Sequence, residues 1–354
     1  MGKAGHRHIT GLGDLLLLRV RVTALVITAI LVAAATFYVT QKAYSPSVVH
    51  PAVSQPTRSV DADYQIKRLT NFKFIRPLLS AKPVHEYEGY YGIKKSVSDL
   101  IQFYKDQNIL LSASVYMRDF DKSNWTAINR DEKFNPGSIL KIAILMTILK
   151  HEEEHPGFLE SSMAFIYKFK YAEPKVQAIV GKQIEFGRTY THRELLKYMI
   201  EYSDNNAGEL LWLSMDKALF TKMFDDLGLP KPDLNANDIP LSAQDCSAFM
   251  ESLFNAAYLD DKHSEFAIDL LSKSSFKEGI VKGIPSDNLL IAHKFGESGT
   301  SKNKELHETG ILYIKSRPYL ITIMTRGKDN VDYSKLATVL QGISRTIYYN
   351  LIQK

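Results

Sequence analysis

Ser138 and Lys141 stand three residues apart at the start of an apolar segment, PGSILKIAILMTILK. A serine hydroxyl becomes a good nucleophile when a base takes its proton, and a neutral lysine amine can act as that base. Positions i and i+3 of a helix share a face, so both side chains should point the same way. An apolar helix disfavours the ammonium form and lowers the pKa of Lys141, while N–H groups at a helix start favour an oxyanion. The pair therefore predicts acyl transfer to serine.

The spacing alone is a weak signal. Ser274 and Ser301 also precede a lysine by three residues, although both lie in polar segments. Lys141 could also extend its amine to solvent with no catalytic role. The position of Ser138 at the mouth of a buried helix is what favours it over the other two serines.

Two further motifs carry groups suited to the same site. In Ser203-Asp204-Asn205, between two predicted helices, Ser203 could relay a proton and Asn205 could hold a substrate carbonyl. Such a triplet is often only a helix cap. Lys294 and Gly296 end a predicted strand, where a lysine can bind a substrate carboxylate and a glycine lets substrate lie against the backbone. The plainer interpretation is a strand followed by a glycine-rich loop.

The order of these motifs resembles that of the penicillin-recognising serine enzymes, and residues 90–354 resemble class A β-lactamases, including the late segments ETGILYI and YLITIMTRG. The resemblance implies a nucleophile at Ser138, its base at Lys141, a proton shuttle at Ser203, an amide contact at Asn205 and a carboxylate anchor at Lys294. It also implies an oxyanion hole made by the backbone N–H groups of Ser138 and Glu297. No metal and no organic cofactor are implied.

The loop that activates water in class A enzymes differs here. KPDLN resembles the family's Glu-Pro-x-Leu-Asn, but Lys231 stands where the glutamate belongs. A lysine cannot polarise water as a carboxylate does unless it is neutral. Asp233 is a conceivable substitute in this shorter loop.

The strand motif differs as well. Phe295 replaces a hydroxyl residue, a loss that Ser298 or Thr300 could offset. Glu297 places a carboxyl beside the expected oxyanion hole, and two like charges about 5 Å apart repel by roughly 3 kcal/mol at an effective dielectric near 20. We expect Arg326 to offset this charge if it lines the same cleft.

These features predict an enzyme that can be acylated but deacylates slowly. Acylation needs Ser138, Lys141 and the oxyanion N–H groups, which are present, whereas deacylation needs a water activator that is not evident. We therefore expect a serine acyl-enzyme hydrolase that acts on β-lactams or D-alanyl cell-wall peptides with slow deacylation. The alternative is a non-catalytic protein of the same fold that binds a cell-wall peptide or glycan.

Strands predicted at both ends of the part after residue 83 must position these groups. Alternating residues predict a hairpin at 110–117 and 125–128 and later strands at 289–295, 309–314 and 319–324. Helices are predicted at 97–105, after Ser138, after the capping box Thr191-x-x-Glu194, at 207–215, 242–258 and 331–349. The pattern predicts an α+β fold, with an antiparallel sheet of N- and C-terminal strands and a helical subdomain.

The composition is that of a globular protein, with 45% hydrophobic and 23% charged residues among 354. The lone Cys246 excludes an intramolecular disulfide and a cysteine-based zinc cluster, and the ten histidines lack metal-ligand spacing. The net charge is +5, of which +3 falls within residues 1–21. The rest of the chain has no basic face that could bind a nucleic acid, so we expect no nucleic-acid partner.

Residues 22–39, VTALVITAILVAAATFYV, contain no Asp, Glu, Lys or Arg and would span about 27 Å as a helix, enough for a hydrocarbon core. The basic flank before them predicts a cytoplasmic N-terminus. The alternative is a signal peptide cleaved near Ala33-Ala34-Ala35. The predicted organisation is a cytoplasmic segment at 1–21, a single membrane anchor at 22–39, an extracytoplasmic linker at 40–83 and a periplasmic or extracellular catalytic domain at 84–354.

Overall fold

The computed structural model describes residues 64–69, 74, 77–167, 169, 178–179, 181–236, 238–286, 288–300 and 302–353, together with Ala24, Thr28 and Val32. The chain divides into two compact units, Met1–Asp61 and Ala62–Lys354. Apart from those three residues, the predicted membrane helix lies outside the described residues. Within the described part of the chain we find no helix with the length and apolarity that a membrane crossing requires. The membrane anchor stays a prediction.

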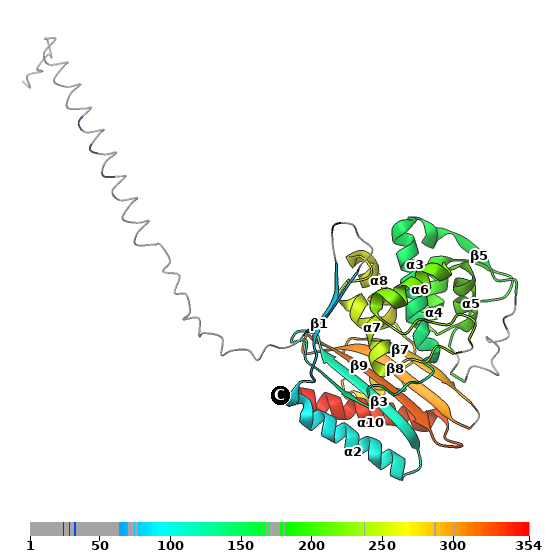
Figure 1. Ribbon diagram of the computed structural model, residues 1–354. Helices are drawn as coiled ribbons and strands as arrows, with labels where there is room; N and C mark the ends of the chain where they lie inside the picture. The colour runs from blue at the N-terminus through cyan, green and yellow to red at the C-terminus, as the bar shows by residue number, and fades with distance from the viewer. Residues whose placement is uncertain are drawn as a thin grey trace, which may run out of the picture. The chain divides into compact units, whose positions relative to one another are not determined.

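An antiparallel sheet of five strands, in the order β4-β3-β9-β8-β7, forms the centre of the second unit (Figure 1). Its strands are β3 (Leu110–Asp119), β4 (Trp125–Ile128), β7 (Ile291–Gly299), β8 (Lys304–Ile314) and β9 (Arg317–Gly327). The pairing of β3 with β9 joins the early hairpin to the late strands. The predicted α+β fold, with a sheet built from both ends of the catalytic region, is confirmed.

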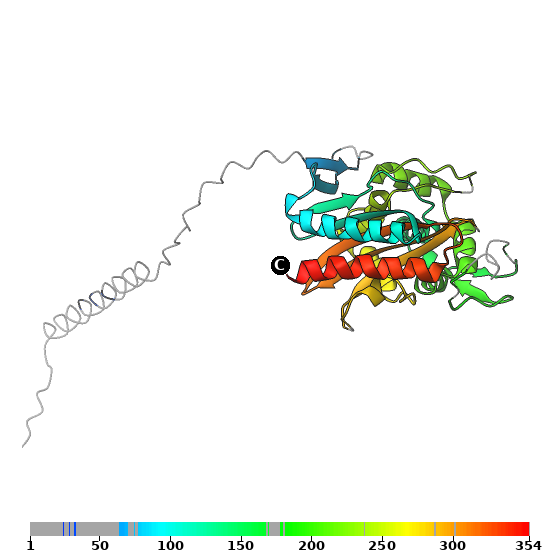
Figure 2. The same cartoon turned by 90° about the horizontal axis from the view of Figure 1, so that it is seen from below.

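Two long helices, α2 (Tyr91–Asp106) and α10 (Tyr333–Ile352), lie side by side on one face of the sheet (Figures 1 and 2). Apolar residues recur along α2 at helical spacing, so that Ile93, Val97 and Ile101 are buried against the sheet. The short helix α9 (Ile280–Gly283) packs against α10. Both predicted helices on this face exist and are longer than predicted.

The other face carries a helical block. Its helices are α3 (Lys141–Glu154), α4 (His192–Glu201), α5 (Asn205–Ser214), α6 (Lys217–Leu227), α7 (Ala243–Phe254) and α8 (Asp261–Ser272). All residues of α3 from Lys141 to Leu149 are buried, as expected of a segment that is apolar on every side. The capping box predicted at Thr191 begins α4. This block brings α3 and the turn between α4 and α5 to the inner face of the sheet.

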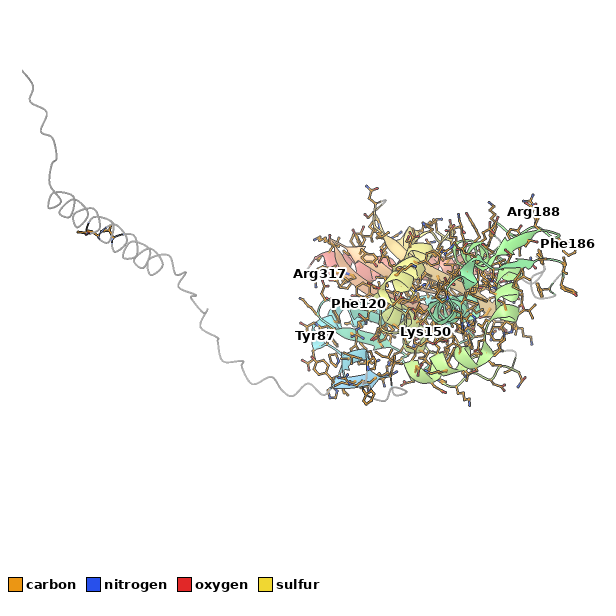
Figure 3. All side chains as sticks on the ribbon, turned by 90° about the horizontal axis from the view of Figure 1, so that it is seen from above. Tyr87, Phe120, Lys150, Phe186, Arg188 and Arg317 are labelled. Atoms are coloured by element: carbon orange, nitrogen blue, oxygen red, sulfur yellow. The ribbon has the colours of Figure 1, made fainter. Side chains whose placement is uncertain are left out.

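Short elements complete the unit. The 3-10 turns are η1 (Glu88–Tyr90), η2 (Gly137–Leu140) and η3 (Phe158–Glu160), and β5 (Ser162–Ala164) pairs with β6 (Thr189–Thr191). Phe186 and Arg188, just before β6, lie at the opposite end of the unit from Tyr87 and Arg317 (Figure 3).

The segment predicted as a linker contains a hairpin. β1 (Tyr64–Arg68) and β2 (Leu78–Pro83) pair antiparallel, and the folded unit begins at Ala62 rather than at residue 84. Hydrogen bonds attach the hairpin to the unit: Trp125 Nε1 donates to Pro83 O at 2.8 Å, Arg118 Nη2 to Ala81 O at 3.0 Å and Lys67 Nζ to Leu227 O at 2.6 Å. Most of β1 is exposed. Without an apolar face, this strand gives no alternating sequence signal.

β7 extends four residues beyond the predicted end at Phe295. The added residues pair with β8, with Glu297 opposite Leu306. The added residues are polar or glycine, so they lack the apolar alternation that predicts a strand. As a result, Gly296 and Glu297 belong to the rigid sheet instead of a loop.

Candidate active site

Ser138 lies in the 3-10 turn η2, and α3 begins only at Lys141. The sequence predicted one continuous helix. The turn begins at Gly137, whose backbone is left-handed with φ 52°. Side chains three residues apart are eclipsed in a 3-10 turn. Ser138 and Lys141 therefore still share a face, and Ser138 is half-buried.

The Lys141 amine points at the turn between α4 and α5. Its Nζ donates to Ser203 O and to Asn205 Oδ1, each at 2.6 Å, and lies 3.4 Å from Ser203 Oγ. Gly208 lies beside the lysine stem, and a Cβ there would be in ordinary contact with Lys141 Cε at 3.4 Å. Lys141 is only 7% exposed. The alternative in which it extends to solvent is therefore wrong.

The triplet Ser203-Asp204-Asn205 caps α5 and also lies beside the Lys141 amine. Ser203 is left-handed, with φ 56°, a conformation that costs of order 1–3 kcal/mol and needs support from its surroundings. Asp204 supplies it: Oδ1 accepts the Asn206 N–H at 2.9 Å and begins α5, and Oδ2 accepts the Ile184 N–H at 2.7 Å. The buried Asp204 thus holds its two neighbours toward Lys141.

Lys294 reaches the same turn from β7. Its Nζ donates to Ser203 Oγ and to Phe295 O, each at 2.9 Å, and the residue is 0% exposed. The Phe295 ring centroid lies 4.2 Å from the amine. The amine that was predicted to anchor a substrate carboxylate thus faces the Ser203 hydroxyl, which lies within 3.4 Å of both lysine amines.

Burial lowers the pKa of both lysines. It brings the pKa of Lys141 from 10.5 to about 7, although the carboxylates of Asp204, Glu297 and Glu209 oppose the shift. Burial, followed by the positive charge of Lys141, lowers the pKa of Lys294 well below its ordinary value. Near neutral pH a substantial fraction of Lys141 is the neutral amine that a general base requires.

Gly137 and Gly296 let the nucleophile turn pack against β7. A Cβ on Gly296 would lie 2.2 Å from Pro136 O, and a Cβ on Gly137 would lie 2.2 Å from Glu297 O and 3.2 Å from its N. Gly296 therefore has a packing role, and its role in leaving room for substrate stays a prediction. The same approach brings the backbone of Glu297 beside Ser138, as an oxyanion hole at these two residues requires.

The Glu297 side chain is occupied by backbone donors. Oε1 accepts the N–H groups of Ala178 at 2.9 Å and Ile179 at 3.2 Å. Burial raises the pKa of Glu297, while these hydrogen bonds and the two lysines lower it. The carboxylate therefore binds the backbone N–H groups of residues 178 and 179.

The substitutes expected at the strand end are engaged elsewhere. Ser298 Oγ donates to Asn135 O at 2.6 Å, and Thr300 Oγ1 accepts the Asn303 N–H at 3.2 Å. Arg326 Nε donates to Glu305 at 2.6 Å. The expectation that Arg326 balances the charge of Glu297, or that either hydroxyl replaces the one missing at Phe295, is not supported.

Glu209 was not predicted from the sequence, yet its charge acts on Lys141, which is not found for the loop residues Lys231 and Asp233. Asp233 is exposed, and its Oδ1 accepts the Asn235 N–H at 2.9 Å; Lys231 is exposed too. Glu209 is half-buried one helical turn after Asn205 on the same face of α5. Its charge acts on Lys141, and burial raises its own pKa. A four-residue spacing from Asn205 was the available signal.

One group of potential metal ligands is found among the described residues, away from this site: Glu153, Asp260 and His263. Their atoms already bond one another. His263 Nδ1 lies 2.8 Å from Asp260 Oδ1, and the Asp260 N–H donates to Glu153 Oε1 at 2.7 Å. We assign no metal to them.

Residues 93–351 match the model of the β-lactamase enzyme family. The chain belongs to this family. It is thus a serine hydrolase of the β-lactamase type, whose chemistry passes through an acyl-enzyme. Among curated proteins, none matches the chain.

Solved structures share the fold. A class A β-lactamase from Mycobacterium abscessus is 19% identical with a TM-score of 0.62, covering 73% of this chain and 99% of that one. A β-lactamase from Chitinophaga pinensis is 16% identical with a TM-score of 0.62, covering 73% and 99%. A PBP-A variant, solved as its acyl-enzyme complex with penicillin G, is 17% identical with a TM-score of 0.61, covering 74% and 97%.

Gly296→Ala should destabilise the protein, because its Cβ would meet Pro136 O at 2.2 Å and Ile139 N at 3.0 Å, both backbone atoms. We expect a loss of about 1–3 kcal/mol in the free energy of unfolding, measured by chemical denaturation. Gly92→Ala in α2 is the matched control, since nothing lies within 4 Å of that Cβ; it should be neutral or slightly stabilising. Equal stability of the two variants would contradict the packing role.

Proposed function

We propose that this chain is an exported, membrane-tethered serine hydrolase that opens β-lactams or D-alanyl cell-wall peptides through an ester on Ser138. The observation that carries the proposal is the enclosed Lys141 amine, with a pKa of about 7, beside Ser203 and Asn205. The apolar run at residues 22–39 and its basic flank support the tether. The acyl-enzyme of PBP-A with penicillin G supports a β-lactam as one substrate class.

Each residue of the site has a role in acylation. Neutral Lys141 takes the proton of Ser138 Oγ as this oxygen attacks the amide carbonyl carbon. The resulting oxyanion is stabilised by the backbone N–H groups of Ser138 and Glu297. When the C–N bond breaks, the proton passes through the Ser203 hydroxyl to the leaving nitrogen. Asn205 orients the substrate amide. Water then cleaves the ester, releasing the acid and restoring the serine.

Binding of an acidic substrate must involve Lys294. A carboxylate beside its amine would compensate the buried positive charge and raise the lowered pKa of Lys294. Two of the three N–H donors of the ammonium bond Ser203 and Phe295, so a carboxylate can accept the third or replace Ser203 as the partner of Lys294. Such a replacement would leave Ser203 with Lys141, which orders the proton pathway once substrate is bound.

Fluorescent penicillin should label the full-length wild-type protein, and Ser138→Ala should abolish the adduct, because the ester oxygen is lost. Intact-protein mass spectrometry measures both. Ser301→Ala, which removes the serine of another Ser-x-x-Lys, is the matched control and should label normally. An unlabelled wild type, or an adduct that persists in Ser138→Ala, would refute the proposal.

The acylation rate should rise with pH through about 7, as Lys141 loses its proton. A single ionisation predicts a roughly tenfold increase between pH 6 and pH 8. Stopped-flow measurement of acyl-enzyme formation from pH 5.5 to 8.5 tests this. Lys141→Ala should acylate at least 100-fold more slowly, and its acylation rate should not rise through pH 7. If the variant keeps the same rise with pH, the ionisation belongs to another group.

Glu209→Gln should lengthen the lifetime of the acyl-enzyme at least tenfold and change its rate of formation less than twofold. Glu209 is the half-buried carboxylate on the Asn205 face of α5, so it is suited to activate the deacylating water. Decay of the adduct after removal of excess β-lactam gives the lifetime. Asp233→Asn, which alters the exposed loop carboxylate, should change neither rate. A longer acyl-enzyme lifetime in Asp233→Asn but not in Glu209→Gln would contradict the role of Glu209 and assign activation of water to Asp233.

A further inference from the structure

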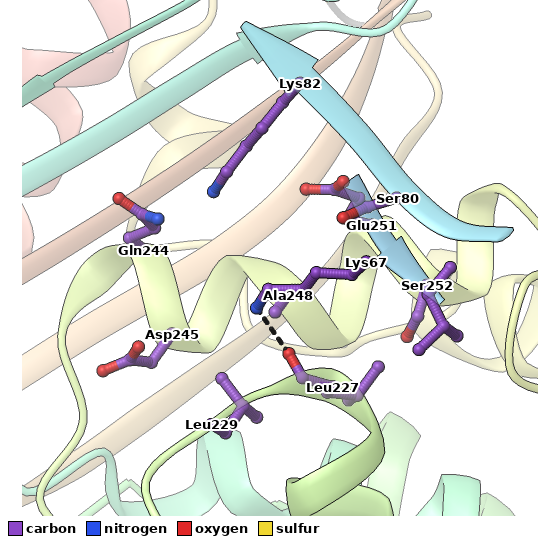
Figure 4. Close-up of a pocket in the computed structure, with 11 residues that line it drawn as sticks. Lys67, Ser80, Lys82, Leu227, Leu229, Gln244, Asp245, Ala248, Glu251 and Ser252 are labelled. Atoms are coloured by element: carbon purple, nitrogen blue, oxygen red, sulfur yellow. Dashed lines mark hydrogen bonds between the residues drawn. The ribbon is translucent and has the colours of Figure 1, made fainter. Parts of the chain in front are cut away.

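Two recesses lie where the β1–β2 hairpin covers α7, apart from the site around Ser138. Lys82, Gln244 and Asp245 line both, and Figure 4 shows the first. The volumes of the recesses are about 40 and about 170 Å³, and roughly 10–15 Å³ of such space is enough for one water molecule. The larger one can hold a small ion.

The Lys82 amine is the central group of these recesses. Lys82 is only 8% exposed, and among the described residues its amine has no hydrogen bond or ion pair; it lies 6.0 Å from the Tyr116 ring centroid. In Figure 4 its side chain extends from β2 into the space between Gln244 and Glu251. A buried ammonium without an anion or an acceptor is costly.

The acidic side chains nearby already have cations. Glu251 accepts from Arg118 Nη1 at 2.5 Å, and Asp245 pairs with Lys133 at 2.5 Å. The basic side chains of this region are Lys67, Lys82, Arg118, Arg130 and Lys133, and the acidic ones are Asp131, Asp245 and Glu251. Two positive charges are therefore in excess.

Helix α7 adds positive potential. Its first turn, including Gln244, lines the larger recess together with the cap residue Ser242, and the N-terminal end of a helix attracts anions. Arg118 Nε, whose positive charge acts on Lys82, has no hydrogen-bond partner in the described part of the chain. A second N–H donor without an acceptor therefore lies near the Lys82 amine.

We propose that the recess between the hairpin and the start of α7 binds a small oxyanion, a phosphate or carboxylate group, on the Lys82 amine. Arg130 and Lys133, at the edge of the recess, contribute long-range attraction. Burial lowers the pKa of Lys82 to about 8, Glu251 opposes this, and Lys67, Arg118 and Arg130 lower it further. An anion seated on the amine would reverse that shift.

Isothermal titration calorimetry of the full-length protein with inorganic phosphate and, separately, acetate at low salt tests the site. We expect saturable binding of at least one, and the stronger of the two identifies the preferred group. Lys82→Met should weaken binding at least tenfold, and Arg130→Met, at an exposed position, about threefold. Lys335→Met, an exposed lysine on α10, is the charge-matched control and should bind as wild type.

Absence of saturable binding by both anions would overturn the proposal, as would wild-type affinity in Lys82→Met or an equal loss in Lys335→Met. If Lys82→Met fails to fold by circular dichroism, Arg130→Met decides the outcome. Penicillin labelling of Ser138 should be unchanged in Arg130→Met. Failure of this site is therefore distinguishable from failure of the proposed catalytic function.

Discussion

The arrangement of two lysine amines around one serine hydroxyl constrains the rest of the site. Both amines lie within 3.4 Å of Ser203 Oγ and are therefore within about 7 Å of each other. Two ammonium groups about 6 Å apart repel by roughly 3 kcal/mol at an effective dielectric near 20, about two pKa units. Burial adds to this cost. The repulsion adds to burial in lowering the pKa of Lys294, whereas burial lowers the pKa of Lys141 to about 7. The enclosure provided by the fold is therefore what makes Lys141 a base at neutral pH.

That pair is maintained by backbone features remote from any substrate. Asp204 stabilises the left-handed Ser203 by capping α5 and by accepting from Ile184. Gly137 and Gly296 allow η2 to contact β7 at distances that no side chain would permit. Lys141 begins α3, whose residues from Lys141 to Leu149 are all buried. Moving any of these supports would let water reach the amines, and solvation would restore their ordinary pKa values.

The sequence predicted what depends on residue type and local pattern: the order of the motifs, the buried helix after Ser138, the capping box at Thr191 and the antiparallel sheet. It missed what depends on tertiary contact. The hairpin at 64–83 has little apolar patterning, and the role of Gly296 is visible only when Pro136 O lies against it. Glu209 stands inside an ordinary helical sequence, and its importance comes from Lys141, 68 positions earlier in the chain.

The departures from the class A pattern also look different in three dimensions. As an isolated charge, Glu297 would oppose an oxyanion and an acidic substrate. Burial raises the pKa of Glu297. Its carboxylate accepts the backbone N–H groups of Ala178 and Ile179, and these bonds and the nearby lysines favour the ionised form. The backbone N–H of a residue does not depend on its side chain. A glutamate at this strand position is therefore compatible with an oxyanion hole, provided that its carboxylate is held away by residues 178 and 179.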